Sequence, residues 1–566
     1  MVSERVSPDK SLNEGNNNWE FYSKDKLGVD VLALKSDKTG AMLATLHGDK
    51  NIKRASIEAW AGSRHSRAPG DTVDILQEIV DKSVDSDQRL ESTFKAYGHA
   101  SVADMARIQI QFNDVPMHLA MHIFNQGTVN NSQEKSTRYQ KKFGKGSMHS
   151  LNVYLPGVSP ELEIDYQNLG KMGLDNFNNQ KPIVADAYGK FYKPDNDNSS
   201  HKAATDSRIL DTIRGNLPLG SNTGFAHETS ARDWGRVISS LKSSPVEYYR
   251  NIGEQIESIL APSEEIEKTL GIRAEAPLLV KYTKADNTVK NNLTAIRNYL
   301  DTRGLSKSFI PEKLDIRFVP QNVRFLNEMS TPDKLVVQYI MAAYPGTQLE
   351  KAADVMYNLS REQISDISEI IFKDHTKYNE MPQQIATPQE LTLLLAGTLG
   401  EARDFNRHRA WGRFMPDVPL FNGPEINSYM FDAILNKGYG LCSYVTDVPE
   451  FKHLKDMICE GFDKYYSKLV DFKTEIEKEY GKDIDYTFMM NTLPLGHNSD
   501  IIMHGNIKQA HYMTHLRVRN GGLINYRQMA YDAAKLISEH DPVYKRMMPP
   551  GNRPDASNRD QFLDRS

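Results

Sequence analysis

The stretch Asn491-Thr492-Leu493-Pro494-Leu495-Gly496 closely repeats an earlier one, Asn216-Leu217-Pro218-Leu219-Gly220. After each of them, a stretch of helical character leads to a Tyr-Arg pair, Tyr249-Arg250 in the first half of the chain and Tyr526-Arg527 in the second. The spacing between these landmarks agrees to within a residue. An internal repeat of this length predicts two copies of one domain.

The chain of 566 residues is also long enough for more than one core. Both ends are rich in polar and helix-breaking residues, which is typical of loose tails. The predicted segments are a flexible tail over 1–25, a first copy over 26–275, a connector over 276–314, a second copy over 315–545 and a flexible tail over 546–566.

Local patterns predict a mostly helical chain with some short strands. Ser330 caps a predicted helix over 332–343, and apolar residues at helical spacing predict helices over 115–124 and 391–406. Apolar and polar residues alternate over 106–112, which predicts a strand. We therefore expect an α+β fold without regular strand-helix-strand alternation. No glycine-rich phosphate loop of the Rossmann or P-loop type is found.

Composition excludes several classes of protein. Hydrophobic residues make up 39% and charged residues 25%, with a net charge of −5, so the chain carries no basic field for nucleic acid. Two cysteines, Cys442 and Cys459, are too few for a disulfide framework or a four-cysteine metal site. The polar start and the absence of an eighteen-residue apolar run predict neither signal peptide nor membrane helix. We expect a cytoplasmic protein.

A polar run from Ser132 to Tyr139 carries candidate ligand-binding residues. On an extended backbone, Glu134, Ser136 and Arg138 point to one face. An arginine fork and a hydroxyl suit a phosphate, and a carboxylate accepts hydrogen bonds from a sugar or a base imide. The alternative is a solvated loop with charges.

A second polar run, Arg407-His408-Arg409, follows the apolar stretch 391–405. Two guanidinium groups beside an imidazole suit a pyrophosphate or an anionic reduced flavin. The alternative is a basic surface turn. Arg214 and Arg517 are further candidate site residues. Each is present in one copy only, since the matching positions in the other copy hold Met490 and Leu241 respectively.

Two histidine pairs occur at helical spacing, His118/His122 and His511/His515. Two imidazoles on one helix face are a beginning of a zinc site, but neither pair has a third ligand or a His-Glu-x-x-His arrangement. We therefore predict no metal site.

These runs resemble the signature of the flavin-dependent thymidylate synthases over most of both copies. In that family an Arg-His-Arg run and a Glu-x-Ser-x-Arg-Tyr run lie side by side. Here the first copy has only the second run (Glu134, Ser136, Arg138 and Tyr139), and Gln126-Gly127-Thr128 replaces Arg-His-Arg. The second copy has only Arg407, His408 and Arg409, followed by Ala410-Trp411-Gly412-Arg413-Phe414. The losses are reciprocal, unlike the decay of one useless copy.

Other positions extend the resemblance. Gly98-His99-Ala100-Ser101-Val102-Ala103-Asp104 is similar to the family's Gly-His-x-Ser-x-x-Glu, with Asp for Glu, and Arg214 matches the arginine before the Leu-Pro pair. In the second copy, Ser330-Thr331-Pro332-Asp333 resembles an early family segment. His375 and Glu380 echo the histidine element, with Lys377 for its serine. Asn506, Lys508 and Leu516-Arg517 resemble the Asn-x-Arg and Leu-Arg positions, and Arg232 fills the former in the first copy.

The resemblance implies reductive methylation of dUMP to dTMP, with FAD as cofactor and NADPH and methylenetetrahydrofolate as co-substrates. It implies dUMP binding by Glu134, Ser136, Arg138, Tyr139 and Arg214. It implies FAD binding by Ser101, Arg232, Arg407, His408, Arg409, Asn506 and Lys508. Arg517 and His99 would be the catalytic residues.

The family builds each site from several subunits of a homotetramer, so this chain would combine its two copies and assemble as a homodimer. Two alternatives stay open: a flavoenzyme of the same fold acting on another pyrimidine nucleotide, and a nucleotide-binding scaffold without catalysis.

Overall fold

The structure is a computed structural model that describes residues 7–23, 30–47, 54–65, 90, 102–126, 131–135, 159–193, 199–272, 274–325, 329–372, 391–408, 410–417, 425–482, 484–540, 548–549 and 551–564. Its contacts divide the chain into two units. Unit 1 comprises Met1–Lys135, Asn152–Tyr154 and Asn222–Asp286. Unit 2 comprises Ser136–Leu151, Leu155–Ser221 and Asn287–Ser566. The first predicted copy therefore contributes residues to both units.

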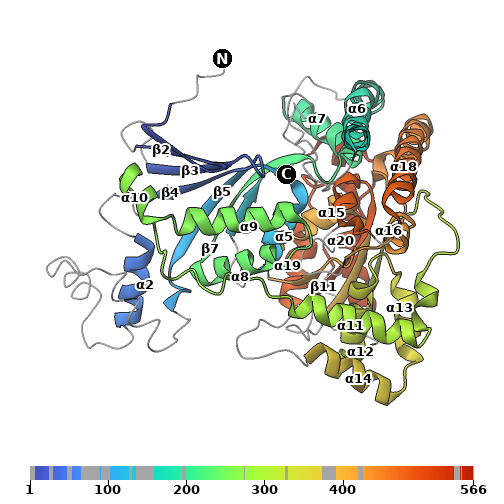
Figure 1. The fold of residues 1–566 in the computed structure, drawn as a ribbon. Coiled ribbons are helices and arrows are strands. Elements are labelled where there is room, and N and C mark those ends of the chain that lie inside the picture. Colours follow the sequence, from blue (N-terminus) through green and yellow to red (C-terminus); the bar gives the residue numbers. More distant parts are fainter. Residues whose placement is uncertain are drawn as a thin grey trace. The chain divides into compact units, whose positions relative to one another are not determined.

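The described strands of unit 1 form one antiparallel sheet in the order β1-β2-β3-β4-β5-β7-β6. They are β1 (Lys10–Glu14), β2 (Asn17–Tyr22), β3 (Asp30–Ser36), β4 (Met42–His47), β5 (Arg107–Pro116), β6 (Asn131–Glu134) and β7 (Asn222–Ser230). Helices α8 (Ala231–Lys242) and α9 (Glu247–Leu260) run along this sheet (Figure 1). The apolar stripes of the two helices bury Trp234 and Ile256 against the strands.

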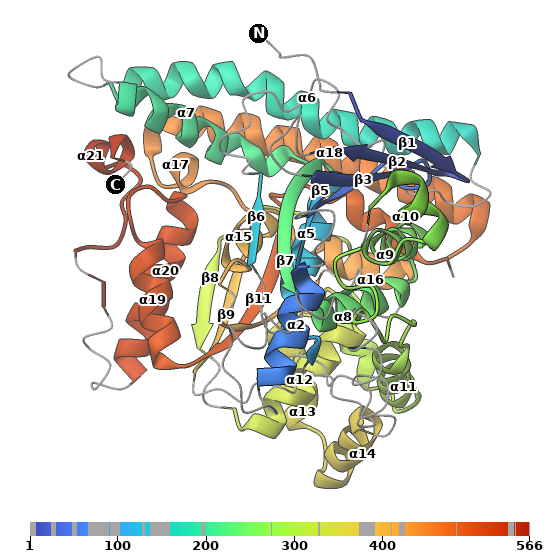
Figure 2. The ribbon, with the colours of Figure 1, turned by 90° about the vertical axis from the view of Figure 1, so that its left-hand side faces the viewer.

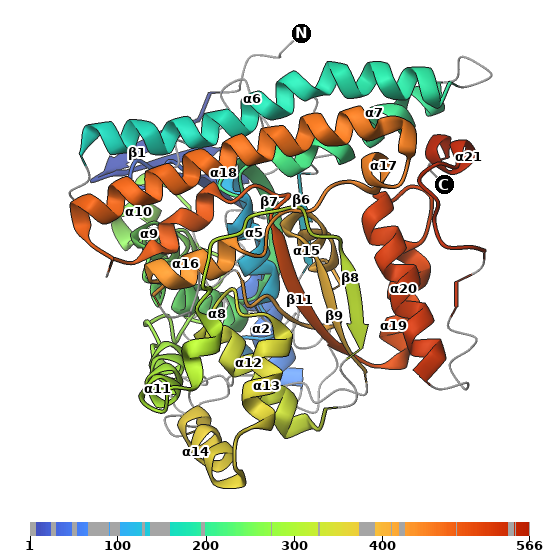
Figure 3. The same ribbon diagram turned by 90° about the vertical axis from the view of Figure 1, so that its right-hand side faces the viewer.

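The described strands of unit 2 form a smaller antiparallel sheet in the order β10-β11-β9-β8. They are β8 (Asn322–Phe325), β9 (Leu391–Thr398), β10 (Gly412–Phe414) and β11 (Asn498–Gly505). Two long helices, α6 (Pro160–Phe191) and α18 (Lys452–Tyr480), run side by side in this unit (Figure 3). Helices α19 (Ile507–Arg517) and α20 (Ile524–His540) stand beside β8 (Figure 2). The chain thus has the expected α+β fold, and every described helix is too short or too polar to cross a membrane.

The same order of elements occurs in both halves of the chain. The strand order β4-β5-β7-β6 of unit 1 corresponds to β8-β9-β11-β10 of unit 2. A short helix follows the second strand of each set, α5 (Met117–Asn125) after β5 and α15 (Leu399–Phe405) after β9. The Leu-Pro-Leu-Gly stretches each follow a 3-10 turn, η2 (Arg214–Asn216) and η5 (Tyr486–Thr492), and precede β7 and β11. The two predicted copies therefore share one topology.

The two Leu-Pro-Leu-Gly stretches pair with each other inside unit 2. The backbone N–H of Leu219 donates to the Leu493 carbonyl at 2.6 Å, and that of Leu495 donates to the Leu217 carbonyl at 2.7 Å. Pro218 and Pro494 form the antiparallel bridge between them. Proline fits at the bridge because the flanking residues supply the N–H donors. This pairing fixes Arg214, three residues before Leu217, beside elements of the second copy.

Two helix predictions need correction and two local predictions are confirmed. The predicted helix over 391–406 is wrong for Leu391–Thr398, which is strand β9. Almost all of β9 is buried, and a continuous apolar run does not distinguish a buried strand from a buried helix.

The predicted helix over 115–124 begins only at Met117. The predicted strand over 106–112 lies within β5 apart from its first residue. The helix after Ser330 is α12 (Thr331–Ala343), and the Ser330 hydroxyl accepts from the Asp333 N–H at 3.3 Å.

The expectation of flexible ends is wrong for much of both tails. Residues 10–22 include β1 and β2, where Trp19 is fully buried because the sheet extends to this edge. Near the other end, α21 (Arg559–Leu563) places the Phe562 ring on the Tyr192 ring, with centroids 3.8 Å apart. The buried Arg208 guanidinium donates to the Phe562 and Gly522 carbonyls. The polar composition of the tails does not reveal these contacts, because a few buried side chains suffice to order a tail.

The predicted connector over 276–314 contains helix α11 (Thr288–Thr302).

A glycine after α16 (Ser428–Leu435) provides a test of backbone packing in unit 2. Gly438 has φ +69°, and a Cβ added there would lie 2.0 Å from the Arg317 carbonyl oxygen. Gly304 also has positive φ, +67°, but a Cβ added at this position would meet only Cε of Lys307, at an ordinary contact distance of 3.8 Å. We expect Gly438→Ala to lower the free energy of unfolding by about 2–4 kcal/mol, because left-handed strain and overlap add. Gly304→Ala is expected to cost about 1 kcal/mol from strain alone. Urea unfolding of both variants measures the difference, and equal losses would contradict the role of the Arg317 contact.

Candidate functional site

The candidate site of unit 2 lies at the C-terminal end of α15. Strand β9 leads into this helix through a capping box, in which the Thr398 N–H donates to Glu401 at 2.8 Å. The helix ends at Phe405, and Asn406, Arg407 and His408 follow. His408 is buried and Arg407 is exposed. Positive groups at this end of a helix are stabilised by the partial negative charge of its free carbonyls.

Arg214 reaches this helix from the first predicted copy. Its Nη2 donates to Oδ2 of Asp404 at 2.9 Å, although 190 residues separate the two in sequence. Both side chains are almost fully buried, with 6% and 11% of their side-chain surface exposed. Among the described residues, Asp404 is the only hydrogen-bond partner of Arg214, so the rest of its fork is available for another acceptor.

Arg517 reaches the same helix end from the last residue of α19. Its Nε donates to Nε2 of His408 at 2.6 Å, and its Nη2 donates to the Asp404 carbonyl at 2.8 Å. The guanidinium also lies over the Tyr526 ring, 5.0 Å from the centroid. Arg517 therefore caps α15 and has a defined orientation.

The electrostatics of the cluster are dominated by arginine. Burial raises the pKa of the Asp404 carboxyl, but the charges of Arg214, Arg407 and Arg517 outweigh burial and hold that pKa well below its ordinary range. Burial, with the charges of Arg517 and Arg413, lowers the pKa of His408 to about 3. Arg214, Arg407 and Arg517 thus act on Asp404 beside a neutral imidazole, and the charges of Asp211 and Glu401 also act on Arg214. Three arginines near one helix end suit an anionic ligand.

The equivalent positions of the other copy lack these charges. Met490, which matches Arg214, and Leu241, which matches Arg517, are both fully buried. The positions of Met490 and Leu241 therefore do not carry a second arginine cluster.

Other predicted residues belong to unit 1. Glu134 is the last residue of β6, opposite Phe225 of β7. Arg232 donates to Asp104 at 3.2 Å, so two positions of the resemblance meet there, with both side chains partly exposed. Arg214 and its cluster thus belong to unit 2, and Glu134 belongs to unit 1.

Several predicted site residues lie outside the described residues. They are His99, Ser101, Ser136, Arg138, Tyr139, His375, Lys377, Glu380 and Arg409.

Asn506 has a structural role at the start of α19. Its side chain accepts from the Gln509 N–H at 3.1 Å, and the Gln509 side chain accepts from the Asn506 N–H, which completes a capping box. Lys508 lies in the first turn of this helix. In unit 1, the Ser230 side chain caps α8 by accepting from the Asp233 N–H, and Arg232 is the second residue of that helix. The predicted match between Arg232 and Lys508 therefore agrees with the positions of both residues in the fold.

Asp404, the centre of the cluster, is not among the residues predicted from the sequence. The spacing was a usable signal, because residues three and four positions apart, such as Asp404 with Arg407 and His408, can interact at the end of a helix. Its pairing with Arg214 had no local signal.

The histidine pairs have partners other than metal. His118 bonds the Tyr249 hydroxyl, with Nδ1 at 2.6 Å, and His122 Nε2 lies 3.1 Å from the Ser240 hydroxyl. His511 and His515 stack on each other, with ring centroids 3.9 Å apart. The described part of the chain contains no group of three or more potential metal ligands.

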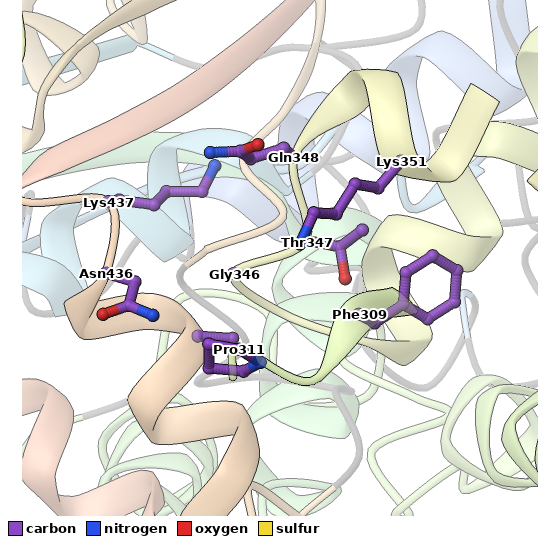
Figure 4. Close-up of a pocket in the computed structure, with 9 residues that line it drawn as sticks. Phe309, Pro311, Gly346, Thr347, Gln348, Lys351, Asn436 and Lys437 are labelled. Carbon is purple, nitrogen blue, oxygen red and sulfur yellow. The ribbon is translucent and has the colours of Figure 1, made fainter. Parts of the chain in front are cut away.

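A small cavity of about 80 Å³ lies elsewhere in unit 2 (Figure 4). It lies between the segment around Gly346, the turn at Asn436 and Lys437, and Phe309 with Pro311. None of the predicted site residues lines it. The Lys437 ammonium bonds Asp417 at 2.8 Å and Asp500 at 2.6 Å, so it serves the core of the unit.

Comparison with known proteins finds distant relatives. No family model matches the chain. It is 21% identical over 481 residues to a UPF0159 protein of Chlamydia muridarum (strain MoPn / Nigg), over 83% of this chain and 81% of the relative. It is 20% identical over 486 residues to a UPF0159 protein of Chlamydia pneumoniae, over 82% of this chain and 80% of the relative. The similarity therefore extends over both halves of the chain.

Proposed function

We propose that this protein is an enzyme similar to the flavin-dependent thymidylate synthases, which converts dUMP to dTMP with methylenetetrahydrofolate and NADPH. The observation that carries the proposal is the arginine cluster at the end of α15. Arg214 from the first copy and Arg517 from the second both bond Asp404, next to His408. Both arginines are also candidates on the sequence alone, independently of these contacts.

The cluster has the charge that such a reaction needs. Arg214, Arg407 and Arg517 all act on Asp404, and His408 is neutral. Guanidinium groups gathered in this way fit a nucleotide phosphate or an anionic flavin. FAD, when bound, would supply the hydride chemistry, and the chain would bind and orient the reactants.

The proposal assigns roles to the arginines of the cluster and to two residues of unit 1. Arg214, through the part of its fork that Asp404 does not use, would bind the dUMP phosphate. Arg517, whose orientation is fixed by His408 and the end of α15, would donate to the uracil and stabilise the charge that develops on it. Arg407 would hold the flavin, with Arg409. For Glu134 and Arg232, both in unit 1, we keep the roles that the resemblance implies, in binding dUMP and FAD respectively.

The test is a spectrum of the purified protein with added FAD, followed by NADPH oxidation with and without dUMP and methylenetetrahydrofolate. We expect bound FAD, dUMP-dependent oxidation and formation of dTMP. In Arg517→Met we expect dTMP formation to fall by about 100-fold or more with FAD retained. The matched control is His453→Gln, a substitution of an exposed histidine of α18.

Three outcomes oppose the proposal in different ways. A protein that binds no FAD favours a nucleotide-binding scaffold. Oxidation that depends on another pyrimidine monophosphate, and not on dUMP, favours a repurposed flavoenzyme. Full activity in Arg517→Met removes the cluster from the site.

A further inference from the structure

The contact between Arg517 and His408 defines the protonation state of the imidazole. An arginine side chain has five N–H donors and no acceptor. Because Nε of Arg517 lies 2.6 Å from Nε2 of His408, Nε2 must carry the lone pair and the ring proton must be on Nδ1. A protonated ring would place a second N–H donor against the guanidinium and remove this bond.

The surroundings of His408 keep the ring neutral. It is 6% exposed, and the charged groups that act on it are Arg517, Arg413 and Asp404. Arg413 of β10 also donates to the Asn406 carbonyl, so this second cation is fixed beside the turn that holds His408. The Tyr512 ring, 6.4 Å away edge-on, and Phe405 complete the neighbourhood. Two arginines against one carboxylate oppose a further positive charge at this position.

We propose that His408 is a positioning residue for Arg517, acting as a neutral acceptor, and not a cation that contacts the flavin. This refines the role expected from the resemblance, in which the histidine belongs to the flavin-binding run. The positioning role of His408 rests on the proposed function only in that uracil is named as the group that Arg517 binds.

Three contacts from different elements fix the guanidinium. His408 holds Nε, the Asp404 carbonyl holds Nη2, and the Tyr526 ring covers one face. Tyr526 is itself held in place by close packing, since a Cβ added at Gly522 would lie 2.6 Å from its hydroxyl oxygen. Among the described residues, Nη1 has no hydrogen-bond partner, so this is the edge that meets a ligand. Without His408, the Arg517 side chain loses the hydrogen bond at Nε that helps to set the orientation of the guanidinium plane.

The first experiment is independent of enzymatic activity. Selective ¹⁵N labelling of histidine, with His408→Gln to assign the signal, reports the tautomer and the titration of the ring by NMR. We expect a neutral ring with the proton on Nδ1 across the pH range in which an ordinary histidine titrates. Titration of His408 near the ordinary histidine pKa would overturn the proposal, whether or not the protein makes dTMP.

The second experiment compares two substitutions of the same residue. His408→Gln retains a neutral acceptor, whereas His408→Phe keeps the ring and removes the acceptor. We expect kcat/KM for dUMP to fall by about 100-fold in His408→Phe and by about 10-fold or less in His408→Gln, with FAD content unchanged. In an Arg517→Met background, His408→Phe should have little further effect, because its partner is already absent.

The opposite results have distinct meanings. Loss of FAD in His408→Phe, or a full additional loss in the Arg517→Met background, would assign His408 to the flavin and overturn the positioning role. If no variant, including the wild type, makes dTMP, the proposed function fails. The tautomer measurement and the binding of uridine monophosphate to the His408 variants then decide the positioning role alone.

Discussion

Asp404→Leu is expected to lower the free energy of unfolding of the protein by about 3–5 kcal/mol, because it leaves the buried Arg214 guanidinium without its carboxylate. Arg214→Met, which introduces the residue found at position 490 of the other copy, is expected to cost somewhat less, because Asp404 loses its hydrogen-bond donor but keeps the charges of Arg407 and Arg517 nearby. The double variant should be more stable than the sum of the two losses predicts, since neither charge then remains buried. Urea unfolding of the four proteins measures the coupling.

An exposed pair provides the matched control for this cycle. Lys190 and Asp186 also form an ion pair in unit 2, but 76% and 65% of their side-chain surfaces are exposed. The corresponding cycle with Asp186→Leu and Lys190→Met should give a coupling of about 0.5 kcal/mol or less. A coupling at Asp404 and Arg214 as small as in this control would show that the buried pair does not organise the cluster.

Lys437→Met is expected to have the second large effect, a loss of about 3–5 kcal/mol. Burial disfavours the ammonium, but Asp417 and Asp500 outweigh burial and raise the pKa of Lys437. Without it, two carboxylates with 1% and 13% of their surface exposed face each other without a cation. Asp500→Asn in the same chain should recover part of the loss by removing one of the like charges.

The pH dependence of the Lys437→Met loss follows from linkage. Two buried carboxylates without a cation have a raised pKa in the folded state, so the folded state binds a proton more readily than the unfolded state. Lowering the pH from about 7 towards about 4 should therefore reduce the stability difference from the wild type. The control is Lys464→Met, at an exposed pair of α18, whose effect should stay within about 0.5 kcal/mol at each pH. A loss that is constant with pH would contradict this account.

The local sequence pattern did not distinguish strand β9 from helix α15. The apolar run over 391–405 predicted a buried helix leading to Arg407 and His408, and the run is buried but helical only from Leu399 to Phe405. It did not predict that the run is a strand followed by a helix of seven residues, since both faces of the strand are covered and the period is hidden. The capping pair Thr398 and Glu401 was the available signal for the start of the helix.

The sequence by itself determined the features that depend on residues close together in the chain. These are the repeated Leu-Pro-Leu-Gly stretch, the cap at Ser330, the strand over 107–112, and the choice of Arg214, His408 and Arg517 as candidates. Each is readable because it depends on the local backbone or on a short pattern of side chains.

Only the tertiary structure decided which candidates meet. The bond between Arg214 and Asp404 joins residues 190 positions apart, and that between Arg517 and His408 joins residues 109 positions apart. The order of the tails likewise depends on Trp19 and Phe562 fitting into distant cores. The physical reason is that these contacts arise from the packing of whole elements, here the mutual pairing of the two Leu-Pro-Leu-Gly stretches, and no local period or composition records which distant element a side chain will face.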